Sequence, residues 1–227
     1  MSSFEDIPVI DTIQMDQLLA KLTPIFKGVR QTGGYWICGR SSKFGFRPSF
    51  TSNWLPKMIK EWIQLLETGY IVITPLIFYT CDKDDPENMS VHQELFDKED
   101  FLVNNHYNVL ISHLTKDGNI YLERYEPADT TMQNNLDDRL KKLFIETFAK
   151  VSSRKIDYRL INQTGLQAKY KDTTLCGHHI VYWIIYRLKY GDDKSISLIA
   201  DPSDTGKGFL KFCSCLNEFQ ESCAVQV

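Results

Sequence analysis

Residues 176–186 read Cys-Gly-His-His-Ile-Val-Tyr-Trp-Ile-Ile-Tyr, and this stretch decides the fold. Its apolar run predicts a helix over 176–190 that is buried in a protein core. Cys176 stands at the first turn of that helix, where backbone N–H groups lack intrahelical partners. Taken alone, Cys176 favours core packing, because free cysteine is among the most buried residue types. The segments upstream of the helix add a second interpretation.

Working outward, the chain alternates helical and strand-like patterns without a regular strand–helix–strand repeat, which predicts the α+β class. Pro75 interrupts an otherwise β-rich run, so residues 70–79 are expected to form an edge strand with a bulge or two short pieces. Gln167 is expected on a loop. The predicted helices cover 8–24, 54–67, 134–151, 176–190 and 206–219, and the predicted strands cover 35–38, 70–79, 107–112, 119–125, 156–162 and 195–200.

Composition excludes several function classes. The formal net charge of −3 gives no global positive field for nucleic acid or an anionic membrane. No apolar run reaches the ~18 residues that span a bilayer, and residues 1–6 lack the pattern of a secretory signal. These features predict a cytosolic, nuclear or virion setting rather than secretion. Residues 82–100 are acidic and without period, which indicates a surface insertion.

The cysteines do not form a metal-binding pattern. Cys213 and Cys215 give a C-x-C spacing with no matching second pair, although Cys223 and His178 or His179 lie in the same part of the sequence. Structural zinc sites use C-x2-C-type pairs, so core packing is the better interpretation of these thiols. The sequence predicts neither a metal nor an organic cofactor.

A histidine and an acid precede Cys176 at element boundaries. His106 begins a strand, where one side of its ring can face a cleft while the other is held by a partner. Glu123 and Glu126 both lie on the neighbouring strand, and their different parity places them on opposite faces. Glu126, directly before Pro127 at the strand end, is the favoured partner for His106, and Glu123 is the alternative.

Gln167 completes the set. Its amide can donate a hydrogen bond to an oxyanion, and one such donor is worth ~3 kcal/mol of barrier. A loop glutamine is usually only solvated, so Gln167 gains weight from its place behind Gly165 and nine positions before Cys176. Histidine, acid, glutamine and cysteine in this order are the groups that a thiol nucleophile requires.

The order and local sequences resemble the cysteine proteases that include the adenovirus maturation protease and the SUMO-specific (Ulp/SENP) proteases. The resemblance covers about 104–190 and depends on four motifs. Two departures, Tyr107 in place of tryptophan after the histidine and Leu175 in place of aspartate before the cysteine, weaken a SUMO-protease assignment more than a viral one. The motifs are His106-Tyr107, Tyr125-Glu126-Pro127, Gly165-Leu166-Gln167 and Cys176-Gly177.

This resemblance implies a papain-like, adenain-like core with a mixed central sheet, formed by residues 104–227, with residues 1–103 packed on it in an unassigned role. It implies that Cys176 attacks a peptide carbonyl, His106 transfers the proton, Glu126 orients His106, and Gln167 with the Cys176 N–H holds the oxyanion. Tyr107 and Gly177 are expected to contact the substrate.

The function implied is a viral maturation-type endopeptidase that cleaves capsid or core precursors at glycine-rich sites, with a possible activating peptide or protein. Two alternatives stay open. The same fold would also suit removal of ubiquitin or a SUMO-like modifier from conjugates. A binding module that has lost catalysis is the alternative from a different class.

Overall fold

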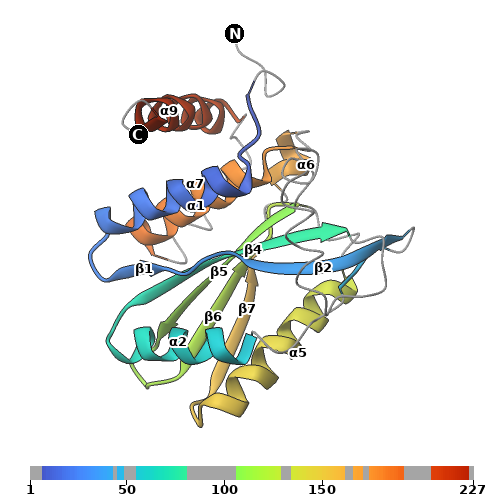
Figure 1. The fold of residues 1–227 in the computed structure, drawn as a ribbon, viewed down its shortest axis with the longest axis vertical. Coiled ribbons are helices and arrows are strands. Elements are labelled where there is room, and N and C mark those ends of the chain that lie inside the picture. Colours follow the sequence, from blue (N-terminus) through green and yellow to red (C-terminus); the bar gives the residue numbers. More distant parts are fainter. Residues whose placement is uncertain are drawn as a thin grey trace.

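A seven-stranded mixed sheet organises the chain, with helices on both of its faces (Figure 1). This arrangement confirms the expected α+β class with a mixed central sheet. The computed structural model describes residues 7–42, 45–48, 55–80, 106–128, 134–161, 166–170, 174–191 and 206–224. The acidic segment 82–100 and the predicted strand 195–200 lie outside these described residues.

The strand order is β3-β2-β4-β5-β6-β7, and β1 also pairs with β4. Neighbours β2–β3, β4–β5 and β5–β6 are antiparallel, whereas β1–β4, β2–β4 and β6–β7 are parallel. The strands are β1 (Val29–Gln31), β2 (Tyr35–Ser42), β3 (Gly45–Pro48), β4 (Ile71–Thr80), β5 (His106–Leu114), β6 (Ile120–Tyr125) and β7 (Ile156–Ile161).

Strand β4 is a single strand within the sheet, so the expectation of an edge strand or two pieces is wrong. On one side β4 pairs first with β1 over Ile71–Ile73 and then with β2 from Leu76 onward. Pro75 falls in the gap between these two partners. Because the backbone groups of alternate residues point to the same side of a strand, its missing N–H faces this gap and removes no ladder hydrogen bond.

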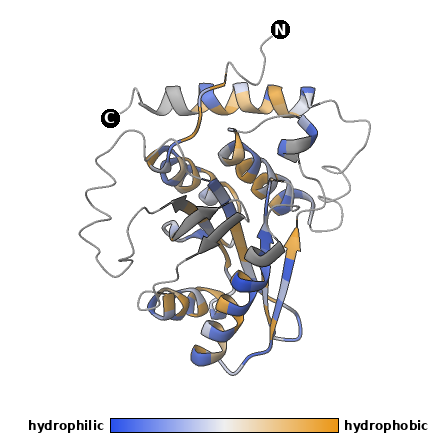
Figure 2. Ribbon diagram, turned by 90° about the vertical axis from the view of Figure 1, so that its right-hand side faces the viewer, coloured by the Kyte–Doolittle hydropathy of each residue, from blue (hydrophilic) through white to orange (hydrophobic). Residues whose placement is uncertain are grey.

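Four helices cover the two faces of the sheet (Figure 1). Helices α1 and α7 lie on one face and α2 and α5 on the other, because each helix buries a stripe of apolar side chains at helical spacing. The side view in Figure 2 shows α9 as an outer helix on the α1/α7 side. The helices are α1 (Thr12–Leu22), α2 (Leu55–Glu67), α5 (Asn134–Val151), α6 (Leu166–Tyr170), α7 (Cys176–Tyr190) and α9 (Lys207–Ala224), with a 3-10 turn at Thr23–Ile25.

Two large apolar clusters lie on the two faces of the sheet, and a third, smaller cluster is formed by Ile7, Leu175, Phe209 and Cys213. The alternation of strand side chains sends Val109 and Tyr125 to the α1/α7 face and Leu110 and Leu122 to the α2/α5 face. Tyr125 stacks on Trp183 of α7 with ring centroids 4.8 Å apart. Helix α7 therefore packs directly on β6.

The N-terminal part of the chain shares this sheet. β4 pairs with β5 from Val72↔Ser112 to Phe78↔His106, across the expected boundary at residue 103. Helices α1 and α2 contribute to the same two clusters as α7 and α5. Residues 7–80, where described, thus complete the core that residues 106–191 begin.

The described part of the chain lacks two further features. None of its helices combines the length and the apolar character needed to cross a bilayer. Within the same residues, no group of three or more His, Cys, Asp or Glu side chains is placed to hold a metal ion. Of the cysteines discussed above, Cys213 is buried and Cys215 is exposed.

Gly177 sets how closely α1 packs on the start of α7. A Cβ at this position would lie 3.2 Å from both Ile10 Cβ and Met15 Cε. Both of these side chains are fully buried, so there is little room for them to move. A glycine follows Cys176 because Ile10 and Met15 leave little room for a side chain at this position.

We expect Gly177→Leu to lower the free energy of unfolding by about 1–3 kcal/mol, the usual cost of overpacking a core. Urea denaturation followed by circular dichroism measures this change. Gly208→Leu on α9 is the matched control, because a Cβ there meets nothing within 4 Å. Equal stability of the two variants would contradict the close packing of α1 on α7.

Candidate active site

The candidate residues lie together along one edge of the sheet, where strand β5 begins and strand β6 ends. β5 starts at His106, and its antiparallel neighbour β6 ends at Tyr125, so His106 and Glu126 emerge at the same edge. Glu126 continues the line of β6, since its N–H donates to the Ile161 carbonyl at 3.0 Å. Helix α7 begins at Cys176 above this edge. The fold therefore brings residues about 20 and 70 positions apart to one place.

His106 and Glu126 form a direct contact. His106 Nε2 lies 2.7 Å from Glu126 Oε1, and the side chain of Glu126 is fully buried while that of His106 is 29% exposed. The imidazole thus reaches solvent while its partner does not. This geometry separates the two glutamates that the sequence left open.

Glu123 lies on the opposite face of β6. Both of its carboxylate oxygens accept from Arg187 Nε of α7 at 3.0 Å. A period of two along a regular strand sends residues 123 and 126 to different faces, so only one of them can contact His106. Glu123 instead joins α7 to β6.

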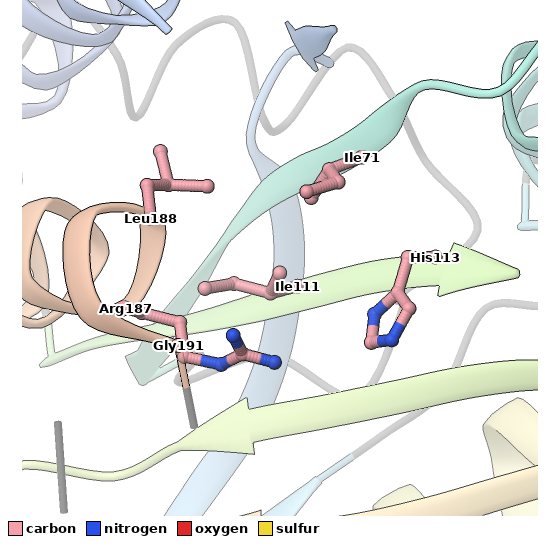
Figure 3. A pocket seen from close by; sticks show the side chains of 6 residues that line it. All are labelled: Ile71, Ile111, His113, Arg187, Leu188 and Gly191. Atoms are coloured by element: carbon pink, nitrogen blue, oxygen red, sulfur yellow. The ribbon is translucent and has the colours of Figure 1, made fainter. Parts of the chain in front are cut away.

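The end of α7 that carries Arg187 is remote from Cys176. Eleven residues separate the two positions, which corresponds to about 16 Å along a helix axis. Figure 3 shows Arg187 reaching from α7 over the sheet, beside a cavity of about 170 Å³. The cavity is lined by Ile71, Ile111, His113, Arg187, Leu188 and Gly191. This hollow is therefore separate from the His106–Glu126 site.

Electrostatics favour the charged forms of both partners. Burial alone would lower the pKa of His106, but the charge of Glu126 and hydrogen bonds with Cys176 and Glu126 outweigh burial and raise that pKa to about 10. Burial alone would raise the pKa of Glu126, yet His106, Arg124 and the Ala128 N–H together hold it below its usual range. An imidazolium–carboxylate pair therefore exists at neutral pH.

Cys176 completes the contact from the other side. It is the first residue of α7, it is 5% exposed, and its side chain hydrogen-bonds His106. Because Nε2 of His106 is held by Glu126, the remaining ring nitrogen, Nδ1, is the one available to the thiol. A thiol beside an imidazole that is oriented by an acid is the arrangement of a thiol nucleophile with its base.

Gln167 lies on the short helix α6 rather than on a loop, which corrects the expectation. It is 6% exposed, and its main-chain N–H donates to the Pro127 carbonyl at 3.2 Å. Pro127 directly follows Glu126, so this bond ties α6 to the end of β6. Gly165 lies outside the described residues.

Tyr107 and Gly177 do not reach the surface. The side chain of Tyr107 is 1% exposed and packs in the α1/α7 cluster, because its parity on β5 is opposite to that of His106. Gly177 is buried beneath Ile10 and Met15. The expectation that these two residues contact the substrate is therefore replaced by packing roles.

Two residues that sequence reasoning missed surround Glu126. Asn108 donates from Nδ2 to Glu126 Oε2 at 2.9 Å, and Arg124 Nη1 lies 3.6 Å from the same oxygen. Both are buried polar residues next to apolar positions such as Leu110 and Leu122 on the same face. That pattern, a polar side chain two positions from His106 or Glu126, was the available signal.

Comparison with known proteins gives matches to solved structures only. No protein-family model matches the sequence, and no curated protein matches it. The Chlamydia trachomatis effector protein ChlaDUB1 matches with a TM-score of 0.60 over 97% of this chain and 87% of that chain, at 11% sequence identity. The fold is that of papain-like cysteine proteases. This result confirms the expected fold class.

The Legionella pneumophila effector protein RavZ also matches, with a TM-score of 0.47 and 10% identity over 83% of this chain and 51% of that chain. The present chain thus spans about half the length of RavZ. At 11% sequence identity, the likeness to ChlaDUB1 concerns the fold alone.

We expect His106 to titrate near pH 10 and Glu126→Gln to lower its pKa, because the amide removes the charge that outweighs burial. Imidazole NMR across pH 5–11 measures the titration. Glu123→Gln is the matched control, since it removes a buried carboxylate on the other face of the same strand. A His106 pKa that falls in Glu123→Gln and is unchanged in Glu126→Gln would contradict the assignment of the pair.

Proposed function

We propose that this protein is a cysteine peptidase that releases ubiquitin or a ubiquitin-like modifier from conjugated proteins. The observation that carries the proposal is the buried Glu126–His106 contact with Cys176 hydrogen-bonded to the same imidazole. A nucleophile, a base and an orienting acid in this order are the parts of a thiol peptidase. The papain-like fold, which positions such a set, is consistent with this role.

The chemistry would proceed in two halves. The Cys176 sulfur attacks the carbonyl carbon of the scissile amide, and the carbonyl oxygen becomes an oxyanion held by the Cys176 N–H and Gln167. The imidazolium of His106 gives its proton to the leaving amine, the C–N bond breaks, and a thioester remains. His106 then takes a proton from water, and the resulting hydroxide attacks the thioester carbon. The C–S bond breaks, which restores the Cys176 thiolate and releases the carboxylic acid product.

The site favours a slender substrate. Cys176 is 5% exposed and Glu126 is fully buried, so we expect a narrow approach to the sulfur. A glycine-rich chain end fits such an approach because it has no side chains to exclude. Ubiquitin-like modifiers and glycine-rich precursor sites share this chemistry.

Between these two substrate classes, the fold likeness supports the modifier. ChlaDUB1, whose name designates a deubiquitinase, matches most of this chain in fold. The expected maturation of viral precursors has the Tyr125-Glu126-Pro127 motif in its favour and no fold match among the structures described above. We therefore place precursor cleavage second, as an outcome that the same assay distinguishes.

We expect Cys176→Ala to lower hydrolysis of ubiquitin and SUMO C-terminal fluorogenic amides by roughly 10⁴-fold or more, the size of effect known for loss of a nucleophile. Electrophilic ubiquitin and SUMO probes should label the wild type at Cys176 only. Cys215→Ala removes an exposed thiol and is the control that keeps activity. Wild-type rates in Cys176→Ala would refute a thiol mechanism, and cleavage of Gly-Gly precursor peptides without probe labelling would favour maturation.

Gln167→Ala should lower kcat about 10²–10³-fold with little change in KM, because an oxyanion donor acts mainly in the transition state. Steady-state kinetics on the better fluorogenic substrate separates the two parameters. Lys169→Ala, an exposed position on the same short helix, is the control. A change confined to KM would assign Gln167 to substrate binding instead.

A further inference from the structure

Behind the His106–Glu126 pair lies a buried polar network that the proposed mechanism does not use. Asn108 and Glu126 are fully buried and Arg124 is 1% exposed. Arg124 Nη1 donates to Asn108 Oδ1, and Arg124 Nη2 lies 3.0 Å from Asp137 Oδ1 of α5. Tyr158 of β7 accepts from Arg124 Nε at 3.0 Å and donates to Asp137 at 2.8 Å.

We propose that Asn108 and Arg124 are positioning residues that fix the Glu126 carboxylate against His106. In its catalytic part the inference rests on the proposed peptidase function. Arg124 acts through Asn108 and Glu126. Asn108 Nδ2 lies 2.9 Å from Glu126 Oε2 and 3.2 Å from His106 Nε2, so Asn108 holds the carboxylate at the point where it meets the imidazole. The argument has three steps: the orientation of an amide, the occupancy of a carboxylate, and the balance of buried charge.

Arg124 decides which way the Asn108 amide points. A guanidinium only donates hydrogen bonds, so the atom of Asn108 that faces it must be the carbonyl oxygen. The amino group of Asn108 is thereby turned toward Glu126 Oε2, which accepts at 2.9 Å. With the opposite orientation, an amide oxygen would face a carboxylate oxygen. The Arg124 contact therefore excludes the unproductive orientation.

Both oxygens of the Glu126 carboxylate accept hydrogen bonds. Oε1 accepts from His106 Nε2 at 2.7 Å and from the Ala128 N–H at 3.0 Å, while Oε2 accepts from Asn108. An occupied Oε2 prevents the group from turning, so Oε1 stays on His106. His106 then keeps its proton on Nε2 and presents Nδ1 to Cys176.

Charge gives the reason for a buried arginine at this place. A buried ion pair is weak evidence for stability, because apolar residues of similar size often serve as well. Arg124 instead provides the positive charge beside an acid that must stay ionised in the core. The groups that face Glu126 are His106 from β5 and Arg124 from β6. Behind these lie Asp137 of α5 and Tyr158 of β7, and Cys176 of α7 acts through His106.

The test compares Arg124→Met and Asn108→Leu with wild type in the full chain. We expect kcat to fall about tenfold to a hundredfold, the size of one charge-assisted hydrogen bond, with KM within about twofold. Loss of the positive charge raises the pKa of Glu126, so Arg124→Met should also move the acid limb of the kcat/KM profile to higher pH. Arg124→Lys keeps the charge and should restore the acid limb but not the full kcat.

Leu110→Ala is the matched control for a purely structural effect. It lies on the same strand and face as Asn108, is fully buried, and belongs to the apolar cluster. It should lower the urea midpoint and leave the acid limb in place. Tyr158→Phe removes one hydroxyl behind Arg124 and provides a mild variant if Arg124→Met does not fold, with a severalfold fall in kcat expected.

Alkylation of Cys176 by iodoacetamide as a function of pH supplies a readout that needs no substrate. One outcome is that the wild type has no peptidase activity, while the pH profile of Cys176 alkylation in Arg124→Met and Asn108→Leu differs from that of the wild type. In that case the proposed function fails and the positioning role stands. If folded variants keep the wild-type kcat and acid limb, or change only with stability as Leu110→Ala does, the positioning role is refuted.

Discussion

The 2.7 Å contact between His106 Nε2 and Glu126 Oε1 depends on a single pairing register, Val109↔Tyr125, between β5 and β6. A slip of one residue in that register would move every side chain of one strand to the other face. Glu126 would then point toward α7 and Glu123 toward α5. The apolar alternation of both strands, which fills two separate clusters, is what excludes this slip. Catalytic geometry and core packing are thus specified by the same pattern.

Strand β6 links the layers of the molecule through its charged residues. Glu123 points to one face and bonds Arg187 of α7, whereas Arg124 points to the other and pairs with Asp137 of α5. Buried charges of this kind are costly unless paired with good geometry, and both pairs are within 3.0 Å. The helix that carries the thiol and the strand that leads to the acid are consequently joined at two places: near Glu123 and at the active-site edge.

Much of the fold could be predicted from periodicity. Helices α5 and α7 have the predicted bounds, because long amphipathic or apolar runs leave little ambiguity. The interior position of β4 could not be predicted. Pro75 is tolerated there because β4 changes its partner from β1 to β2 on one side, and this pairing depends on the tertiary structure. Gln167 was expected on a loop because a five-residue helix carries no periodic signal. Tyr107 and Gly177 were expected to contact the substrate, whereas strand parity and the closeness of α1 bury them.

The candidate site was predictable as a set of residue types and not as a network. Order and element boundaries pointed to His106, Glu126 and Cys176, which the fold brings together. Asn108 and Arg124 gave no motif, because the meaning of a buried polar side chain depends on what the neighbouring strand places beside it. Only the register of β5 and β6 puts these two side chains behind the acid.

The order of the elements along the chain has a consequence for biosynthesis. All seven described strands precede α7, so His106 and Glu126 are already in the emerging sheet when Cys176 leaves the ribosome. Until α7 arrives, the face formed by Ile73, Val109 and Tyr125 lacks its main cover, and the nascent chain holds an acid and a base without a nucleophile. Helix α9 follows α7 in the chain, and its Leu216 joins the same apolar cluster. Chain order therefore places the two sheet residues of the site first, the thiol second and the outer helix last.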